Sequence, residues 1–302
     1  MSYDADTFVV TGCSGFIGRQ AVAAFTAAGR RVIGVSRTPC SFDGAEFVRV
    51  DLLGTDVPHF GSATTVHCAA VTRDGWDPSI MDGNVRTTVS ALRLSDGPFV
   101  HLSSSSVYDL GQPSQDALPE DGHGRYPFFN SYSESKFLSE QLVLASGRDA
   151  VVLRPHAIYG PGDSTLVPRL LARVRAGVLP LPGGGSARHA LTSVDNLLTA
   201  IQLAADARLP GAHVFNVTDA DVLSIAEAAR IVYGRRLRIL PVPVLAAGWA
   251  AARSERRTAV GAEPPLSVYS VQQLSLDRTY NLDRTRAELG YQPLPNSLRY
   301  VS

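Results

Sequence analysis

A glycine-rich segment near the amino end places the tightest constraint on the fold of this chain. The apolar run TFVV (residues 7–10) leads into TGCSGFIG (residues 11–18), and apolar residues then recur at helical spacing. This order predicts a strand, a tight turn and an amphipathic helix. The first glycine allows the turn, the second allows a pyrophosphate close to the backbone, and the third lets the helix pack on the strand. The dinucleotide-binding residues predicted here are Gly12, Gly15, Phe16, Ile17 and Gly18.

Apolar runs and helical patterns then alternate along the chain. Alternation of this kind indicates a parallel sheet with helices on both faces. We therefore predict an α/β fold, a Rossmann-like doubly wound parallel sheet with a smaller C-terminal substrate-binding lobe. The expected domains are residues 1–160 for the dinucleotide and 161–302 mainly for the substrate, with about 189–218 returning to the first domain. The expected strands are residues 31–35, 47–50, 64–68, 99–102, 151–154 and 214–216, and the expected helices include 80–94 and 166–176.

The residues that follow the second, third and fourth strands are candidates for cofactor contacts. Ser36 and Arg37 follow the second strand, where folds that select NAD usually carry an acid on the ribose 2′-hydroxyl. A hydroxyl followed by a cation favours the 2′-phosphate of NADP instead, with NAD as the alternative. The further contacts expected are Asp51, Leu52, Ala69 and Ala70.

Lys136 is the only lysine in the chain, whose other 27 basic residues are all arginine. Lysine is a compact point charge with rotatable donors, which the planar guanidinium cannot imitate. Tyr132 lies four positions earlier, so the two side chains share a face if the segment is helical. An ammonium at that distance favours the phenolate and lowers the pKa of a phenol. The pair therefore predicts an acid-base site.

Two further motifs complete a recognisable order. A serine run, residues 103–106, follows the strand at 99–102, and LRPHAIYGPG occupies residues 153–162. With the glycine turn and Tyr-x-x-x-Lys, these resemble the extended short-chain dehydrogenase/reductase superfamily, in its NAD-dependent epimerase/dehydratase family. LVPRLL at residues 166–171 is similar to the 3β-hydroxysteroid-dehydrogenase-like branch. The match covers essentially the whole chain.

The resemblance implies roles for individual residues. It implies Ser104, Tyr132 and Lys136 as catalytic groups, with the serine and tyrosine hydrogen-bonded to the reacting oxygen and the lysine on the cofactor ribose. It also implies a homodimer through two helices, one of which carries Tyr132. The expected nicotinamide wall is Pro155, His156 and Ile158, and the candidate substrate contacts are Ser105 and Arg188, the latter for an anionic group.

Three departures from the family pattern narrow the chemistry. Ala157 stands where many sugar-nucleotide members have asparagine, which weakens the sugar-nucleotide interpretation. Sugar dehydratases carry an acidic pair that performs elimination, and this chain has Ser105 and Ser106 at the corresponding positions. Dehydration is therefore not expected. Asp109 replaces the glycine of Val-Tyr-Gly, which predicts a differently shaped turn.

Bulk properties exclude several other classes. The chain has 28 basic and 28 acidic residues, so its net charge favours neither nucleic acid nor an anionic membrane as an electrostatic partner. We expect the pairs Arg235-Arg236 and Arg256-Arg257 to be solvated surface. Three cysteines without paired spacing predict neither a disulfide frame nor a metal site and favour a cytoplasmic setting. No apolar run approaches the length of a membrane span; the longest, residues 242–252, predicts a packed or partly exposed helix.

The sequence thus predicts an NAD(P)-dependent oxidoreductase, with an NADPH-dependent ketone reductase or secondary alcohol dehydrogenase as the leading hypothesis. A nucleotide-sugar 4-epimerase or 4-ketoreductase is the alternative, because it would use the same three residues. A dinucleotide-sensing regulator without catalysis is a third hypothesis, and the tyrosine, lysine and serine together argue against it.

Overall fold

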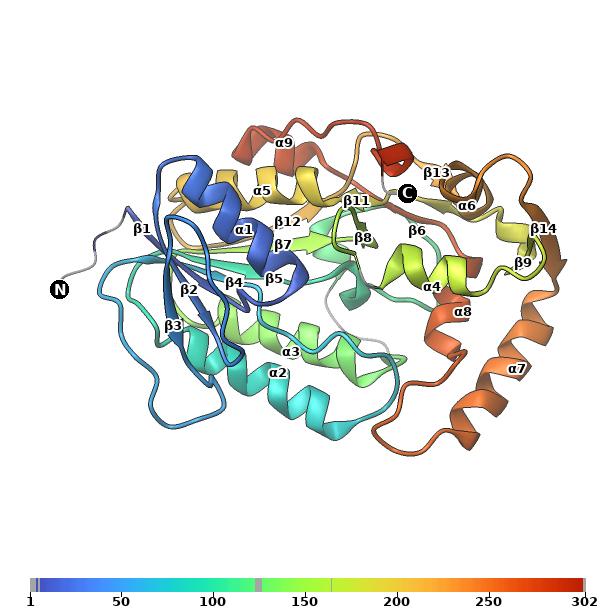
Figure 1. Cartoon of the computed structure of the whole chain (residues 1–302), viewed down its shortest axis with the longest axis horizontal. Helices are drawn as coiled ribbons and strands as arrows, with labels where there is room; N and C mark the ends of the chain where they lie inside the picture. The colour runs from blue at the N-terminus through green and yellow to red at the C-terminus, as the bar shows by residue number, and fades with distance from the viewer. Residues whose placement is uncertain (1–3, 5, 123–126, 164, 301–302) are drawn as a thin grey trace.

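The computed structural model describes residues 4, 6–122, 127–163 and 165–300. Its centre is a seven-stranded sheet in the order β12-β7-β5-β4-β1-β2-β3 (Figure 1). Every neighbouring pair in this sheet is parallel, which confirms the predicted fold class. The strands are β1 (Thr7–Thr11), β2 (Arg31–Ser36), β3 (Glu46–Arg49), β4 (Thr64–His67), β5 (Phe99–Leu102), β7 (Ala150–Pro155) and β12 (Ala212–Val217).

Helices cover both faces of the sheet, as Figure 1 shows. One face carries α1 (Phe16–Ala27), α5 (Val194–Asp206) and α9 (Asp283–Leu289), and the other carries α2 (Pro78–Ala91) and α3 (Ser131–Leu144). Each face has its own apolar core. Burial on both sides explains why β1, β2 and β7 read as nearly continuous apolar runs without alternation.

The order of strands reverses beside β1, which lies between β4 and β2. The segments that leave β1 and β4 run side by side there, since a Cβ atom on Gly12 would lie 2.8 Å from the Cα of Ala69. Gly12 also has a φ of +67°, which a side chain would strain. Open α/β sheets bind their ligands at such a switch point.

The remaining elements form a second layer beyond the carboxyl ends of these strands. Its sheets are short and bring together distant parts of the chain: β13-β10-β15-β6, β11-β8 and β14-β9. The strands are β6 (Ser114–Ala117), β8 (Ile158–Tyr159), β9 (Val178–Pro182), β10 (Arg188–His189), β11 (Thr192–Ser193), β13 (Leu223–Ser224), β14 (Arg238–Val242) and β15 (Arg278–Tyr280). The helices are α4 (Leu166–Ala172), α6 (Ile225–Tyr233), α7 (Val244–Arg257) and α8 (Val268–Ser275).

Several boundaries differ from the sequence prediction. Helix α2 starts at Pro78, earlier than predicted, because the Asp77 carboxylate caps it by accepting from the Ser79 N–H. Helix α4 ends at Ala172 and not at residue 176, where Ala176 and Gly177 both have positive φ angles. The segment before α3 contains a strand absent from the sequence prediction, β6, because β15 pairs with it; residues 123–126 lie outside the described part. Within the described residues, no helix is long and apolar enough to cross a membrane.

Candidate active site

A cavity of about 850 Å³ opens at the carboxyl ends of the central strands. One end is formed by the glycine turn, and the other by α4, α8 and the loop before α8. Of the residues predicted from sequence, it brings together Gly12, Gly15, Phe16, Ile17, Gly18, Ala70, Ser104, Ser105, Tyr132, Lys136, Pro155, His156 and Ile158. The predicted catalytic and nicotinamide residues therefore share one space with the glycine turn.

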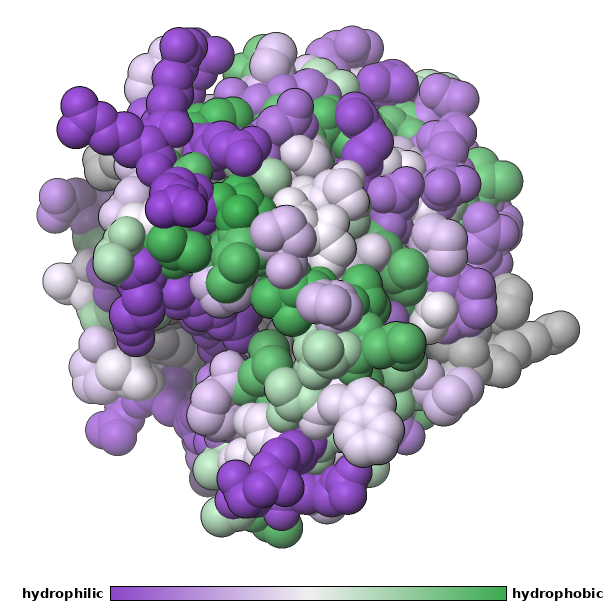
Figure 2. All heavy atoms as spheres, turned by 90° about the vertical axis from the view of Figure 1, so that its right-hand side faces the viewer, coloured by the Kyte–Doolittle hydropathy of each residue, from purple (hydrophilic) through white to green (hydrophobic). Residues whose placement is uncertain are grey.

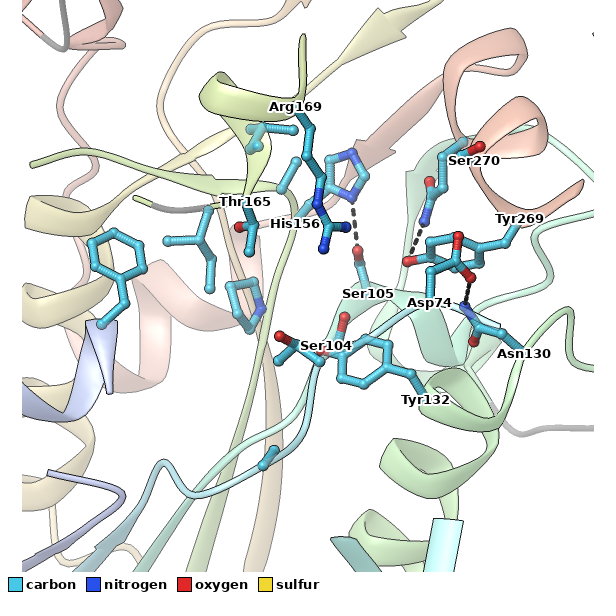
Figure 3. Close-up of a pocket in the computed structure, with 18 of the residues that line it drawn as sticks. Asp74, Ser104, Ser105, Asn130, Tyr132, His156, Thr165, Arg169, Tyr269 and Ser270 are labelled. Atoms are coloured by element: carbon cyan, nitrogen blue, oxygen red, sulfur yellow. Dashed lines mark hydrogen bonds between the residues drawn. The ribbon is translucent and has the colours of Figure 1, made fainter. Parts of the chain in front are cut away.

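Tyr132 and Ser104 lie next to one another in this cavity (Figure 3). Ser104 ends the extended segment after β5, and its Oγ accepts from the N–H of Ser106 at 3.1 Å. The serine hydrogen atom is therefore free to be donated elsewhere. Tyr132 is the second residue of α3, so the start of this helix positions the phenol beside the Ser104 hydroxyl.

The start of α3 is held by a hydrogen-bonded cap. The side chain of Asn130 accepts from the Ser133 N–H at 2.8 Å and donates to Asp74 at 2.8 Å. Asp74 also accepts from the hydroxyl of Ser267, just before α8. These contacts tie the tyrosine helix to the far side of the cavity, and Figure 3 shows Asp74 and Asn130 beside Tyr132.

Burial sets the protonation of the tyrosine and the lysine. It raises the pKa of Tyr132, and the hydrogen bond with the Ser104 side chain opposes that shift. The expectation that Lys136 lowers this pKa is wrong: the pKa is raised, and the Lys136 Nζ donates to the Leu102 carbonyl at 2.7 Å. Burial also lowers the pKa of Lys136 to about 8. The serine is thus the group that favours the phenolate.

Ser105 begins a chain of buried hydrogen bonds. Its Oγ lies 2.8 Å from His156 Nδ1, and His156 Nε2 lies 3.0 Å from His189 Nδ1. Burial, the neighbouring histidine and Arg278 hold the pKa of His156 well below its usual range, and burial lowers that of His189 to about 3. Both rings are therefore neutral, and His156 orients Ser105 in addition to lining the cavity.

The tautomers of His156 and His189 follow from the surroundings of the His189 ring. Among the described residues His189 Nε2 has no hydrogen-bond partner. A buried N–H without an acceptor is rarer than a buried acceptor without a donor, which places the His189 proton on Nδ1. His189 then donates to His156, His156 donates to Ser105, and the Ser105 proton is directed away from the histidines.

Other predicted contacts lie outside the residues that line the cavity. Ser36 and Arg37 are at the end of β2, where the Ser36 hydroxyl donates to the Thr38 carbonyl at 2.7 Å and Arg37 is exposed. Asp51, Leu52 and Ala69 follow β3 and β4. Arg188 is exposed and donates to the Val222 carbonyl at 3.2 Å, so the structure does not bring it to the cavity with Ser104 and Tyr132.

The far wall of the cavity consists of residues that sequence reasoning missed. They include apolar side chains, the phenol of Tyr269 and five charged or titratable side chains. Only Arg169 and Leu170 among them belong to a segment with a recognisable motif, residues 166–171. Arg173 donates to the Pro265 carbonyl at 3.3 Å, and burial and Arg169 lower its pKa. The residues are Asp74, Arg169, Leu170, Arg173, His189, Leu191, Ile225, Glu263, Pro264, Pro265, Tyr269, Gln273 and Leu274.

Ala157 adds a local irregularity between the two walls. It lines the cavity with a φ of +45°, a left-handed conformation that alanine rarely adopts and that asparagine tolerates better. The chain thus adopts a left-handed conformation at this position without an asparagine side chain. The described residues contain no cluster of three or more histidine, cysteine or acidic side chains that could hold a metal ion.

The fold and its cavity place the chain among the extended short-chain dehydrogenases/reductases, a class of dinucleotide-dependent enzymes. Within that class it belongs to the NAD dependent epimerase/dehydratase family, whose family model matches residues 8–218.

Relatives in this family act on different substrates. The chain is 30% identical to a protein of Mycobacterium tuberculosis named 3 beta-hydroxysteroid dehydrogenase/Delta 5→4-isomerase, over 95% of this chain and 86% of that one. It is 27% identical to the 2-alkyl-3-oxoalkanoate reductase of Stenotrophomonas maltophilia, over 94% of each. A solved structure, the UDP-glucuronic acid 4-epimerase of Bacillus cereus with UDP-glucuronic acid and NAD, superimposes with a TM-score of 0.71 at 20% identity, over 98% of this chain and 96% of that one.

Proposed function

We propose that this protein is an NADPH-dependent ketone reductase, or a secondary alcohol dehydrogenase in the opposite direction, with Ser104, Tyr132 and Lys136 as catalytic residues. The observation that carries the proposal is the meeting of the Ser104 hydroxyl and the Tyr132 phenol inside the cavity. Their neighbours Ser105 and Ser106 supply no carboxylate for elimination. The relatives named as a hydroxysteroid dehydrogenase and an oxoalkanoate reductase support the same class of chemistry.

The residues at the switch point fit a dinucleotide. A Cβ atom on Gly18 would lie 2.2 Å from the Gly12 carbonyl oxygen, so glycine keeps the turn compact. Gly15 is the N-cap of α1, and no side chain caps that helix, so backbone N–H groups remain for a phosphate. When bound, the cofactor supplies or accepts the hydride. Arg37, exposed at the end of β2, supports NADP over NAD.

The chain's own residues manage the proton. In the reductive direction Tyr132, whose raised pKa keeps it protonated at neutral pH, donates its proton to the substrate oxygen. Ser104 donates a hydrogen bond to the same oxygen, where negative charge develops. Lys136 would hold the ribose, and apolar residues of the far wall, among them Leu170 and Leu274, exclude water and fit an apolar ketone.

Replacing the two neighbouring serines separately tests which of them is catalytic. We expect Ser104→Ala to lower kcat by about 10²-fold, because one donor to the developing charge is lost. Ser105→Ala should lower kcat by less than about tenfold, since its hydroxyl is hydrogen-bonded to the buried His156 and Tyr280 side chains. Ser104, by contrast, is the serine hydrogen-bonded to Tyr132. Steady-state kinetics with one ketone and NADPH measures both. Equal losses would contradict the assignment of Ser104.

The pKa of Lys136 predicts a pH dependence for cofactor binding. The ammonium form donates hydrogen bonds, and it is lost as the pH rises through about 8. We expect the Kd for NADPH to increase up to about fivefold between pH 8 and pH 9, since the ammonium fraction falls from about one half to about one tenth. In Lys136→Met the Kd should be larger at pH 7 and should not change over this range, as measured by fluorescence titration. The same pH dependence in both proteins would exclude Lys136 as its source.

Incubation with cofactor and a panel of ketones tests the proposed function. A reductase consumes one NADPH for each ketone reduced, and we expect activity with apolar ketones. A nucleotide-sugar 4-epimerase would interconvert its substrates with no net change in NADH or NADPH absorbance, and a 4-ketoreductase would consume NADPH only with nucleotide sugars. No turnover with any substrate, despite cofactor binding, would favour a regulator.

One observation keeps the nucleotide-sugar alternative open. Arg169 and Arg173 both line the cavity, and Arg173 is partly buried, so a diphosphate could be bound there. Solved structures with this fold contain nucleotide sugars. The Arg169 guanidinium, however, already pairs with Glu263 at 2.9 Å, and Ala157 lacks the amide of the sugar-nucleotide members.

We further propose which parts of the chain bind the cofactor and which bind the substrate. Residues 1–160 would hold the cofactor and residues 161–302 mainly the substrate, with about 189–218 returning to the first domain. In support of this, β12 is a strand of the central sheet and α5 packs on one face of it. We propose a homodimer through α2 and α3, which pack against each other on one face of the sheet. The three cysteines are free thiols, which supports a cytoplasmic location.

A further inference from the structure

Helix α7 and the strand before it carry an exposed apolar surface remote from the catalytic residues. Residues 239–252 contain no charged side chain, and much of this segment faces outward. Leu245 and Trp249 are 82% and 79% exposed, and they lie one helical turn apart on one face. Leu240 and Val244 are also exposed. We call Leu240, Val244, Leu245 and Trp249 the apolar α7 surface, and Figure 2 shows apolar residues gathered on this side of the molecule.

Three exposed arginines continue this surface at the end of the same helix. Arg253 and Arg256 follow Leu245 and Trp249 on one helical face, and Arg257 is beside them. The one acid in this turn, Glu255, is partly buried and accepts from the Val268 N–H at 2.7 Å. Although the whole chain has no net charge, this helix therefore presents a positive end next to an apolar face.

From this arrangement we infer that α7 binds the surface of a membrane that contains anionic phospholipid. Helices that lie in a membrane interface combine tryptophan and leucine, which enter the acyl boundary, with arginines that meet anionic headgroups. The opposite face of α7 is already used, because Ala247 and Ala251 pack against Val271 of α8. The outward face is thus fixed in place by the protein.

A second copy of this chain matches the surface less well. A two-fold dimer through the exposed face of α7 would cover the arginines of both copies, and the one acid of α7, Glu255, already accepts from Val268. Lipid phosphates supply negative charge for the arginines. The position also suits an apolar substrate: α8 supplies Tyr269 and Leu274 to the cavity wall, and the loop between α7 and α8 supplies Pro264 and Pro265. The exposed residue Val260 belongs to that loop.

The two tryptophans of the chain make a direct test possible. Trp76→Phe leaves Trp249 as the only tryptophan, so its emission reports on this surface. We expect a blue shift, together with co-sedimentation, when vesicles of phosphatidylcholine with about 30% phosphatidylglycerol are added. Binding to pure phosphatidylcholine should be at least about tenfold weaker, because each arginine near an anionic surface strengthens binding about fivefold.

Matched variants distinguish binding through α7 from non-specific binding of the protein to vesicles. Arg256→Gln/Arg257→Gln should weaken vesicle binding at least about tenfold, whereas Arg93→Gln/Arg299→Gln, which changes exposed arginines on other elements, should leave it within about twofold. Trp249→Ser should also weaken co-sedimentation at least about tenfold. All these residues are exposed, and circular dichroism checks the fold.

Three outcomes would overturn the inference. They are no co-sedimentation with the anionic vesicles, equal binding to both lipid compositions, or equal loss in the two arginine pairs. A lower molar mass of Trp249→Ser in light scattering would show that the surface joins copies of this chain, which also overturns it. The test requires no turnover, so it is independent of the proposed reductase activity.

Discussion

Replacing Tyr132 by phenylalanine should lower kcat by about 10³-fold while the protein still binds NADPH. The change removes the proton donor and keeps the aromatic ring, so the cavity retains its shape, and general acid catalysis contributes about 10²–10⁴-fold. Steady-state kinetics measures the loss, and fluorescence titration measures the Kd, which we expect to change by less than about threefold.

Tyr269→Phe is the matched control, because it removes a phenol from the opposite wall of the same cavity. The Tyr269 hydroxyl accepts from the Gln273 side chain at 3.2 Å and lies on the substrate side. We expect its kcat to stay within about tenfold of the wild type. If Tyr132→Phe kept comparable activity, or if both variants lost the same amount, Tyr132 would not be the proton donor.

Removing the carboxylate of Glu140 should destabilise the fold by about 3–5 kcal/mol, because Arg154 would stay buried without its counter-charge. Both side chains are almost fully buried, and Glu140 Oε2 also accepts from Ser103 at 2.8 Å. The pair connects α3, which carries Tyr132, to β7, which leads into His156. Urea unfolding of Glu140→Gln measures the change in the free energy of unfolding.

Asp206→Asn provides the comparison for this second prediction. Asp206 pairs with Arg30 at 2.9 Å, with side chains 48% and 37% exposed, so solvent screens the interaction. We expect a loss of about 0–1 kcal/mol there. A Glu140→Gln protein as stable as Asp206→Asn would show that water reaches the Arg154 site.

The parts of the fold that sequence predicted well are those in which short segments carry their own signal. The turn at Gly12 needs a positive φ, and a buried parallel strand needs a continuous apolar run, so both leave a pattern within ten residues. The boundary errors had two causes. At α2 the sequence prediction missed a local cap signal, Asp77. Strand β6 was missed because it depends on pairing with β15, which is distant in the sequence.

The sequence predicted the side of the cavity that carries Ser104, Tyr132 and Lys136, but it did not predict the opposite wall. Tyr132 and Lys136 are one helical turn apart, and Ser104 follows a strand, so motif and spacing place them together. His189 reaches His156 across 33 positions, and Tyr269 enters from α8; neither has a local pattern. The direction of the Tyr132 pKa was also mispredicted, because it depends on burial and on where the Lys136 ammonium points.

The sequence by itself determined the parallel sheet and the glycine turn and named the groups that we propose carry protons, because local backbone geometry and side-chain chemistry are properties of adjacent residues. Only the tertiary structure decided the far wall of the cavity, the neutral histidine pair behind Ser105 and the outward direction of Trp249. These depend on which distant segments come into contact and exclude water, and that information is absent from any short stretch of the chain.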